Sequence, residues 1–139
     1  MTYLLDTNVV SELRKPRGKA DENVRAWVVA RPAAELYLSV VTILEIERGI
    51  AQVGRRDELR AQRLQRWLED ELLDVFRARI LPVDVPAARR TARLHVPDPR
   101  PERDALIAGT ALAHNMTVAT RNLRDFEPMG VPVINPWER

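Results

Sequence analysis

The sequence contains no cysteine and only two histidines, His95 and His114. Without cysteine the chain forms no disulfide and offers no thiolate to a metal, and two histidines are too few for a three-histidine zinc site. A chain without cysteine also fits a reducing compartment, so we expect a cytoplasmic protein. Any metal bound here must be held mainly by oxygen.

Long apolar runs are also missing. No stretch approaches the roughly 20 apolar residues that a membrane-spanning helix needs, and the N-terminus lacks the basic and apolar segments of a secretory signal. We therefore expect no membrane association. The 139 residues, 45% of them hydrophobic, are enough for one buried core and too few for two ordinary domains. We expect a single domain over residues 1–139.

Positive charge exceeds negative charge only slightly, with 22 Lys and Arg against 20 Asp and Glu. If four of the acids belong to one metal site, the remaining surface carries 22 cations against 16 anions, which suits a phosphate-rich partner. Twenty of the cations are arginine, whose planar guanidinium binds phosphate through two hydrogen bonds. An arginine-rich genome would produce the same composition, so charge alone does not identify a partner.

Strand-like and helix-like segments alternate along the chain. This pattern predicts an α/β/α sandwich, with a central parallel sheet of about five strands and helices on both faces. The predicted strands are residues 2–5, 36–40, 80–83, 117–119 and 131–134. The first predicted helix is capped by Thr7 or Asn8 and ends at about Leu13, and the second is capped by Asp21 and runs through Val28. Further helices are predicted over 42–53, 56–79, 86–94 and 102–115, with one helical turn over 121–126. Pro86 lies in the first turn of the helix over 86–94.

Ligands of such folds bind outside the carboxyl ends of the strands. Asp6 follows the first predicted strand and Thr120 follows the fourth, so both lie at that edge. Asp6 could instead be a helix cap. Glu45 has a structural alternative too, because Thr42-x-x-Glu45 matches a capping box, in which the glutamate hydrogen-bonds back to the cap amide.

Two further acids have structural alternatives of the same kind. Asp104 lies in the first turn of a predicted helix, where an exposed acid is favoured by the helix dipole. Asp125 stands three residues after Asn122, which could cap the last helical turn. The helix that contains Asp104 is slim around Ala108 and Gly109, so a neighbour can approach its backbone closely. Taken one at a time, each acid is at least as well explained by structure.

Four motifs in order change that balance, because they resemble those of PIN-domain ribonucleases, most closely the VapC and FitB group of bacterial toxins. The motifs cover almost the whole chain. They are Leu4-Leu5-Asp6-Thr7-Asn8-Val9, Ser39-x-x-Thr42-x-x-Glu45-Ile46-x-x-Gly49, Asp104-Ala105-Leu106-Ile107-Ala108 and Ala119-Thr120-Arg121-Asn122-x-x-Asp125-Phe126.

The resemblance implies which residues form the site. Asp6, Asp104, Asp125 and Glu45 would hold Mg²⁺ or Mn²⁺, and Thr120 and Asn122 would shape the site and position water or phosphate. Oxygen ligands are those that Mg²⁺ prefers, and a metal-bound water can attack a phosphodiester. Whether Glu102 or Glu47 joins the acids stays open, as does the number of metal ions.

We therefore predict a metal-dependent endoribonuclease that acts as the toxin of a toxin–antitoxin pair. The resemblance implies a homodimer and a VapB/FitA-like antitoxin that blocks the site, with an arginine of the partner among the acids, and that helps to bind operator DNA. Two alternatives are a nucleic-acid-binding component of a repressor complex with little turnover, and a nuclease of the same fold that cuts DNA. A binding module has no need of four acids facing phosphate, but the acids do not separate RNA from DNA.

Overall fold

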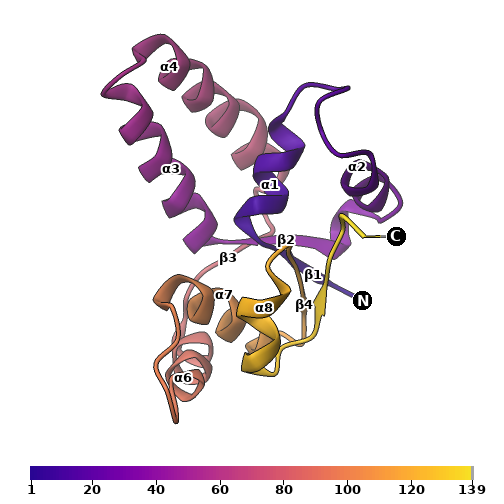
Figure 1. Ribbon diagram of the computed structural model, residues 1–139, viewed down its shortest axis with the longest axis vertical. Coiled ribbons are helices and arrows are strands. Elements are labelled where there is room, and N and C mark those ends of the chain that lie inside the picture. The colour runs from indigo at the N-terminus through magenta and orange to yellow at the C-terminus, as the bar shows by residue number, and fades with distance from the viewer. Residues whose placement is uncertain (139) are drawn as a thin grey trace.

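A parallel sheet forms the centre of the computed structural model, which describes residues 1–138 (Figure 1). Its five strands are hydrogen-bonded in the order β3-β2-β1-β4-β5. Tyr3 of the central strand pairs with Leu36 on one side and with Thr117 on the other. The strands are β1 (Tyr3–Leu5), β2 (Leu36–Ser39), β3 (Ile80–Leu81), β4 (Thr117–Ala119) and β5 (Val133–Ile134). The predicted five-stranded parallel sheet is confirmed.

Helices connect successive strands, as parallel pairing requires. They are α1 (Thr7–Arg14), α2 (Glu22–Val29), α3 (Val40–Gly54), α4 (Glu58–Trp67), α5 (Leu73–Val75), α6 (Val85–Leu94), α7 (Glu102–Ala113) and α8 (Leu123–Phe126). Short 3-10 turns, η1 (Ala33–Glu35) and η3 (Glu127–Met129), follow α2 and α8, and the π-helical segment η2 (Leu68–Leu72) joins α4 to α5. Within residues 1–138, none of these helices is both long enough and apolar enough to cross a membrane.

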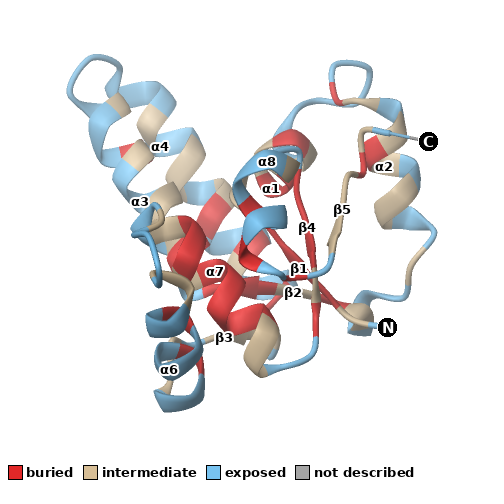
Figure 2. Cartoon of the chain, turned by 60° about the horizontal axis from the view of Figure 1, so that its bottom comes forward, coloured by how far each residue is buried: buried red, intermediate tan, exposed pale blue. Residues whose placement is uncertain are grey.

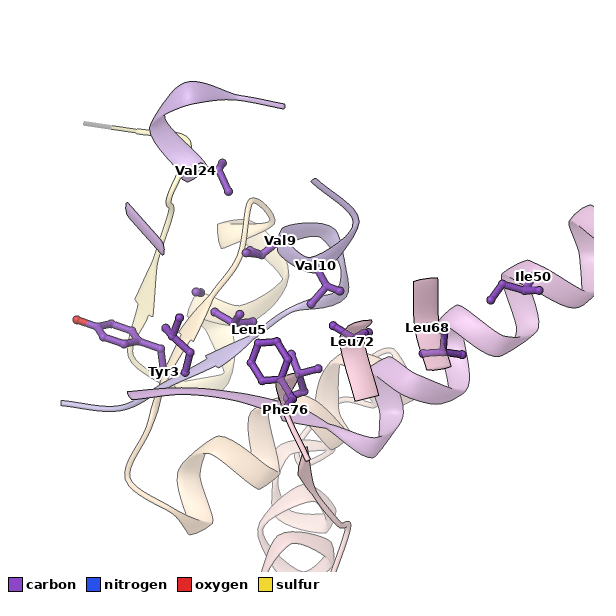
Figure 3. Packing of buried hydrophobic residues seen from close by; sticks show 12 residues of the cluster. Tyr3, Leu5, Val9, Val10, Val24, Ile50, Leu68, Leu72 and Phe76 are labelled. Atoms are coloured by element: carbon purple, nitrogen blue, oxygen red, sulfur yellow. The ribbon is translucent and has the colours of Figure 1, made fainter. Parts of the chain in front are cut away.

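The sheet divides the core in two, because successive side chains of a strand point to opposite faces. Tyr3 and Leu5 pack with residues of α1, α2, α3 and η2, among them Val9 and Leu68 (Figure 3). Leu4, which lies between them, packs with the apolar side of α7 and with Phe126 of α8. Burial is therefore concentrated on the strands and on the inner sides of α1 and α7, while most of α4 and α6 is exposed (Figure 2).

Two predicted helix starts are confirmed. Asp21 caps α2, where its carboxylate accepts hydrogen bonds from the amides of Asn23 and Val24. Pro86 lies in the first turn of α6, and the carboxylate of Asp84 caps that helix through the amide of Ala87. A proline has no amide hydrogen to satisfy, and the first turn of a helix leaves its amides unpaired, so both starts follow from local chemistry.

Other helix boundaries differ from the prediction. The cap of α1 is Asp6 rather than Thr7 or Asn8, since its carboxylate accepts a hydrogen bond from the amide of Thr7. The predicted helix over 56–79 begins later and ends earlier, at Glu58 and Val75, because Asp57 caps it and the chain turns after Val75 to enter β3.

Helices α6 and α7 pack closely, as the small side chains of α7 predict. A Cβ atom added at Gly109 would lie 2.0 Å from Thr91 Oγ1 and 2.8 Å from the backbone nitrogen of Thr91. The hydroxyl of Thr91 donates hydrogen bonds to the carbonyl oxygens of Ala87 and Ala105. The segment that approaches α7 is therefore α6, and it requires glycine at position 109.

The order of the strands changes direction at β1. The chain proceeds from β1 outward to β2 and β3, then returns to β4 on the other side of β1. Asp6 follows β1 and Thr120 follows β4, and the amide of Asp6 donates to the carbonyl oxygen of Ala119 at 2.9 Å. Ligands of open α/β sheets bind at such a reversal of strand order. The fold thus brings the first and fourth motifs together.

Candidate functional site

Asp6 is the buried centre of the site, with no exposed surface. Its Oδ1 accepts hydrogen bonds from the amide of Thr7 and from Nη2 of Arg103, each at 2.8 Å, and its Oδ2 accepts from the hydroxyl of Thr120 at 2.8 Å. A carboxylate costs several kcal/mol to bury unless it is paired and hydrogen-bonded. Asp6 meets both conditions and is a helix cap and a site residue together.

Thr120 holds Asp6 in place from the neighbouring strand end. Its buried hydroxyl donates to Asp6 and accepts hydrogen bonds from the backbone amide of Asn122 at 3.0 Å and from the side-chain amide of Asn8 at 3.3 Å. Asn122 is exposed and stands at the N-cap position of α8, as predicted, but its side chain makes no cap hydrogen bond. Asn8 enters the site through Thr120.

Glu45 reaches the site from the second turn of α3. Its Oε1 lies 2.5 Å from the hydroxyl of Thr7, and its Oε2 accepts a hydrogen bond from Nε of Arg103. The capping-box interpretation is wrong, because Ser39 caps α3 and accepts a hydrogen bond from the amide of Val41 at 3.0 Å. Position 42 lies inside the helix, and its buried hydroxyl is 3.0 Å from that of Thr7. The second motif is thus directed at α1.

Asp104 lies in the first turn of α7 and is 6% exposed, so the interpretation as an exposed first-turn acid is wrong. Its Oδ1 accepts a hydrogen bond from Nη1 of Arg103. Burial raises the pKa of Asp104, and the negative charges of Asp6 and Asp125 raise it further, while the guanidinium of Arg103 opposes them. Asp104 therefore takes up a proton more readily than an ordinary aspartate.

Asp125 lies at the rim of this group. It is exposed on α8, and in residues 1–138 its carboxylate has no hydrogen bond or ion pair. Its charge nevertheless raises the pKa of Asp104, which places the two carboxylates within electrostatic reach of each other. Asp125 faces the site without being held in it.

Arg103 is the residue that the sequence analysis missed. Three of its nitrogens donate to three acids from different parts of the chain, Asp6, Glu45 and Asp104. Burial alone would lower the pKa of Arg103, and the surrounding carboxylates, Asp6 foremost, raise it instead. The available signal was its place directly before Asp104, where the first turn of α7 directs both side chains to the same region.

The two uncertain glutamates point elsewhere. The Glu102 side chain is 77% exposed, and its Oε2 lies 3.8 Å from His95 Nε2. Glu47 accepts a hydrogen bond from Gln65 on the exposed side of α3 and α4. Neither belongs to the group of acids around Arg103.

The donor set suits a hard divalent cation, since Asp6, Glu45 and Asp104 supply only carboxylate oxygen. Within residues 1–138, however, no three His, Cys, Asp or Glu side chains are arranged so that they could hold a metal ion as they stand. The three carboxylates surround the guanidinium of Arg103. In their chemistry these residues fit a divalent metal.

A groove extends from Glu45 along the surface between α1, α3 and α4. Its volume is about 220 Å³, and it joins apolar side chains to the edge of the acid cluster. Its lining residues are Thr7, Ser11, Arg14, Glu45, Ile46, Gly49, Ile50, Val53, Arg60, Leu64 and Trp67. An adjoining hollow of about 130 Å³ is lined by Val10, Leu13, Val75, Phe76 and neighbouring residues of α1 and η2.

Comparison with known proteins agrees with this geometry. The family model described as PIN domain matches residues 3–130. The chain is 39% identical to the "VapC ribonuclease Y4jK" of Sinorhizobium fredii, with 97% of each chain covered, and 37% identical to "Toxin FitB" of Neisseria gonorrhoeae, with 96% of this chain and 97% of the relative covered.

Solved structures give the same result. The crystal structure of FitAcB from Neisseria gonorrhoeae has a TM-score of 0.89 and 35% identity, covering 99% of this chain and 100% of that one. The structure of FitAB bound to the IR36 DNA fragment has a TM-score of 0.86 and 35% identity, covering 99% and 97%. In each case the similarity extends over the whole sheet and the helices that carry the acids.

Proposed function

The chain belongs to the PIN-domain family, and on that basis we propose that it is a metal-dependent endoribonuclease that acts as the toxin of a toxin–antitoxin pair. One observation carries the proposal: Asp6 directly after β1, Glu45 of α3 and Asp104 of α7 meet on a single cationic group at the carboxyl edge of the sheet. The relatives named ribonuclease and toxin support this function.

Asp6, Asp104 and Asp125 would hold Mg²⁺ or Mn²⁺, with Asp125 at the open side of the site, and Glu45 would act directly or through water. The bound cation would neutralise the scissile phosphate and lower the pKa of the attacking water. Thr120 and the amide of Thr7 keep the Asp6 carboxylate in one orientation, and the hydroxyl of Thr7 does the same for Glu45. Asn122, whose backbone amide donates to Thr120, would position water or phosphate.

The experiment compares three proteins on single-stranded and looped RNA with Mg²⁺ or Mn²⁺. Wild type should cleave the RNA, and EDTA should stop cleavage. Asp6→Asn retains the shape of the side chain but removes its charge, so the rate of RNA cleavage should fall about a hundredfold or more. This loss is larger than the loss typical of residues that only orient a metal ligand. The control Asp70→Asn removes an exposed acid of η2 and should cleave like wild type.

The same assay separates the alternatives. Equal inactivity of wild type and Asp6→Asn on every RNA, with metal present, would favour a nucleic-acid-binding component with little turnover. Metal-dependent cleavage of DNA without cleavage of RNA would favour a deoxyribonuclease of the same fold.

The groove between α1, α3 and α4 suits an apolar helix of a small antitoxin. Its apolar lining borders Glu45, so a helix seated there also covers the acids. The structure of FitAB supports a partner of this kind. Coexpression with the neighbouring VapB/FitA-like gene should yield a complex that copurifies, while wild type expressed alone should slow growth and Asp6→Asn should not. Unaffected growth with intact cellular RNA would contradict the toxin function.

We further propose that the protein is a cytoplasmic homodimer and that its antitoxin complex binds operator DNA. The structure of FitAB bound to the IR36 DNA fragment supports the second point. Light scattering coupled to gel filtration measures the dimer, and a gel-shift assay on the promoter measures DNA binding with and without the antitoxin.

A further inference from the structure

Arg103 occupies the position in which the site needs a cation. Its Nη2 donates to Asp6 Oδ1 at 2.8 Å, its Nε to Glu45 Oε2 and its Nη1 to Asp104 Oδ1. Each nitrogen is used for a different acid, so one side chain connects the end of β1, the second turn of α3 and the first turn of α7. The guanidinium is therefore the common neighbour of the three acids.

The oxygens that Arg103 uses are those that a metal ion would need. The other oxygen of Asp6 accepts from Thr120, and the other oxygen of Glu45 faces the hydroxyl of Thr7. Both carboxylates thus have a donor on each oxygen while Arg103 is present. A guanidinium is positively charged, so it repels a divalent cation that approaches the same carboxylates.

The side chain of Arg103 is in contact with solvent. It is 32% exposed, while that of Asp6 is fully buried. Helix α7 packs against the sheet through other residues, among them Ala105, Ile107 and Ala108. The core contacts of α7 therefore do not depend on the guanidinium.

We propose that Arg103 and a divalent cation bind alternately to the carboxylates of Asp6, Glu45 and Asp104, so that Arg103 is the internal counterion of the metal-free site and is displaced when metal binds. This inference rests on the proposed metal-dependent function. Its consequence is that Arg103 stabilises the metal-free protein and at the same time raises the metal concentration needed to fill the site. The chain itself supplies the arginine that the sequence analysis expected from an antitoxin.

The first test is the affinity for Mn²⁺, measured by titration calorimetry without RNA. Arg103→Gln removes the competing charge, and we expect its dissociation constant to fall about tenfold or more, since three charge-assisted hydrogen bonds no longer oppose binding. Arg103→Lys keeps the charge but cannot reach three acids at once, so its dissociation constant should lie between those of wild type and Arg103→Gln. Arg89→Gln removes the same charge from an exposed position on α6 and should bind Mn²⁺ like wild type.

The second test is measured on wild type, and a variant is needed only to assign one signal. The Nε–H signal of Arg103 in a nitrogen-15 spectrum can be assigned by its loss in Arg103→Lys. In metal-free protein this hydrogen should be protected from exchange with water by its bond to Glu45. Saturation with Mg²⁺ should shift the signal and speed its exchange.

The outcomes separate the inference from the function on which it rests. Equal dissociation constants for wild type and Arg103→Gln, or an Arg103 signal unchanged at saturating Mg²⁺, would overturn alternate binding while the metal site stands. Failure of wild type and every variant to bind Mn²⁺ would overturn both. Tighter binding by Arg103→Gln, unaltered binding by Arg89→Gln and a displaced Arg103 signal would together establish the exchange.

Discussion

Asp6 and Thr7 each have two roles in this site: they fix the start of a helix, and they supply or orient a carboxylate of the acid cluster. Asp6 caps α1 and is also the most buried acid of the cluster. Thr7 supplies its amide to Asp6 and its hydroxyl to Glu45, so one residue orients two carboxylates. The hydrogen bonds that fix the start of α1 therefore also hold these side chains in one orientation. The carboxylate oxygens at the carboxyl edge of the sheet are thereby directed toward a ligand.

Asp104 gives a prediction about pH, because its pKa is raised above the ordinary value of about 3.9. Asp104 in the folded protein then binds a proton more readily than in the unfolded chain. Ionised Asp104 therefore lowers the free energy of unfolding above its raised pKa, and this loss of stability disappears as the pH falls toward 3.9. Asp104→Asn should therefore melt at a higher temperature than wild type at pH 7 in EDTA, and the difference should vanish near pH 4.

The measurement is thermal unfolding in EDTA across that pH range, with Asp70→Asn as the exposed control. A variant that is less stable than wild type at pH 7 would mean that the contact between Asp104 and Arg103 outweighs burial and repulsion by Asp6.

At the level of elements, the start of α3 decides what Glu45 does. Ser39 ends β2 and caps α3 directly, without an intervening loop, so the helix begins two residues earlier than predicted. This early start turns position 42 toward the hydroxyl of Thr7 and brings Glu45 to Arg103. The helix end is capped without the glutamate, whose carboxylate is then available to the site.

Ser39→Ala and Glu45→Gln should therefore have different effects. Loss of the cap in Ser39→Ala should lower the free energy of unfolding by about 1 kcal/mol. Glu45→Gln should instead weaken Mn²⁺ binding by roughly tenfold or more, because it removes a carboxylate from the site. Urea unfolding and Mn²⁺ titration of both variants measure the difference. Unaltered Mn²⁺ affinity in Glu45→Gln would remove this residue from the metal site.

The contact between α6 and α7 gives a second prediction at this level. A methyl group at Gly109 would collide with the side chain and backbone of Thr91, so Gly109→Ala should destabilise the protein by about 1–3 kcal/mol. Gly49 of α3 is the matched control, because no atom lies within 4 Å of an added Cβ there. Gly49→Ala should stabilise by about 0.5–1 kcal/mol. Similar melting temperatures for the two variants would show that α6 can move away from α7.

The whole molecule brings acids from distant parts of the chain to one edge of the sheet, so the proposed metal site exists only in the folded state. The four acids stand at positions 6, 45, 104 and 125, so no short segment contains the site. An unfolded chain would not hold the cation in this way, and binding must therefore stabilise the fold.

Mn²⁺ at a hundred times its dissociation constant should stabilise wild type by about 2.7 kcal/mol, which corresponds to a rise in melting temperature of roughly 5 °C or more for a domain of this size. The rise should be absent in Asp6→Asn and unchanged in Asp70→Asn. Differential scanning calorimetry with and without Mn²⁺ provides the measurement. An equal rise in all three proteins would locate the metal elsewhere in the molecule.

Local signals in the sequence were sufficient for the architecture and for part of the site. The alternation of apolar strands with amphipathic helices predicted the parallel sheet, and Asp21 and Pro86 marked helix starts correctly, because these features depend on neighbours within a few residues. The ordered motifs predicted that Asp6, Glu45 and Asp104 lie together. The interpretation of Glu45 as a capping residue was wrong. The spacing Thr42-x-x-Glu45 matches a capping box whether or not the helix begins at Thr42, so the spacing alone does not show where the helix begins.

Only the tertiary structure revealed Arg103. Its partners Asp6 and Glu45 lie 97 and 58 residues away in the sequence, and no local pattern relates residues at such distances. The same holds for the contact between Gly109 and Thr91, which depends on how closely two helices approach. The sequence determined which side chains carry charge and where strands and helices alternate. Packing of the sheet and its helices decided that the guanidinium of Arg103 lies among the acids, because β1, α3 and α7 must all be in place to bring these residues together.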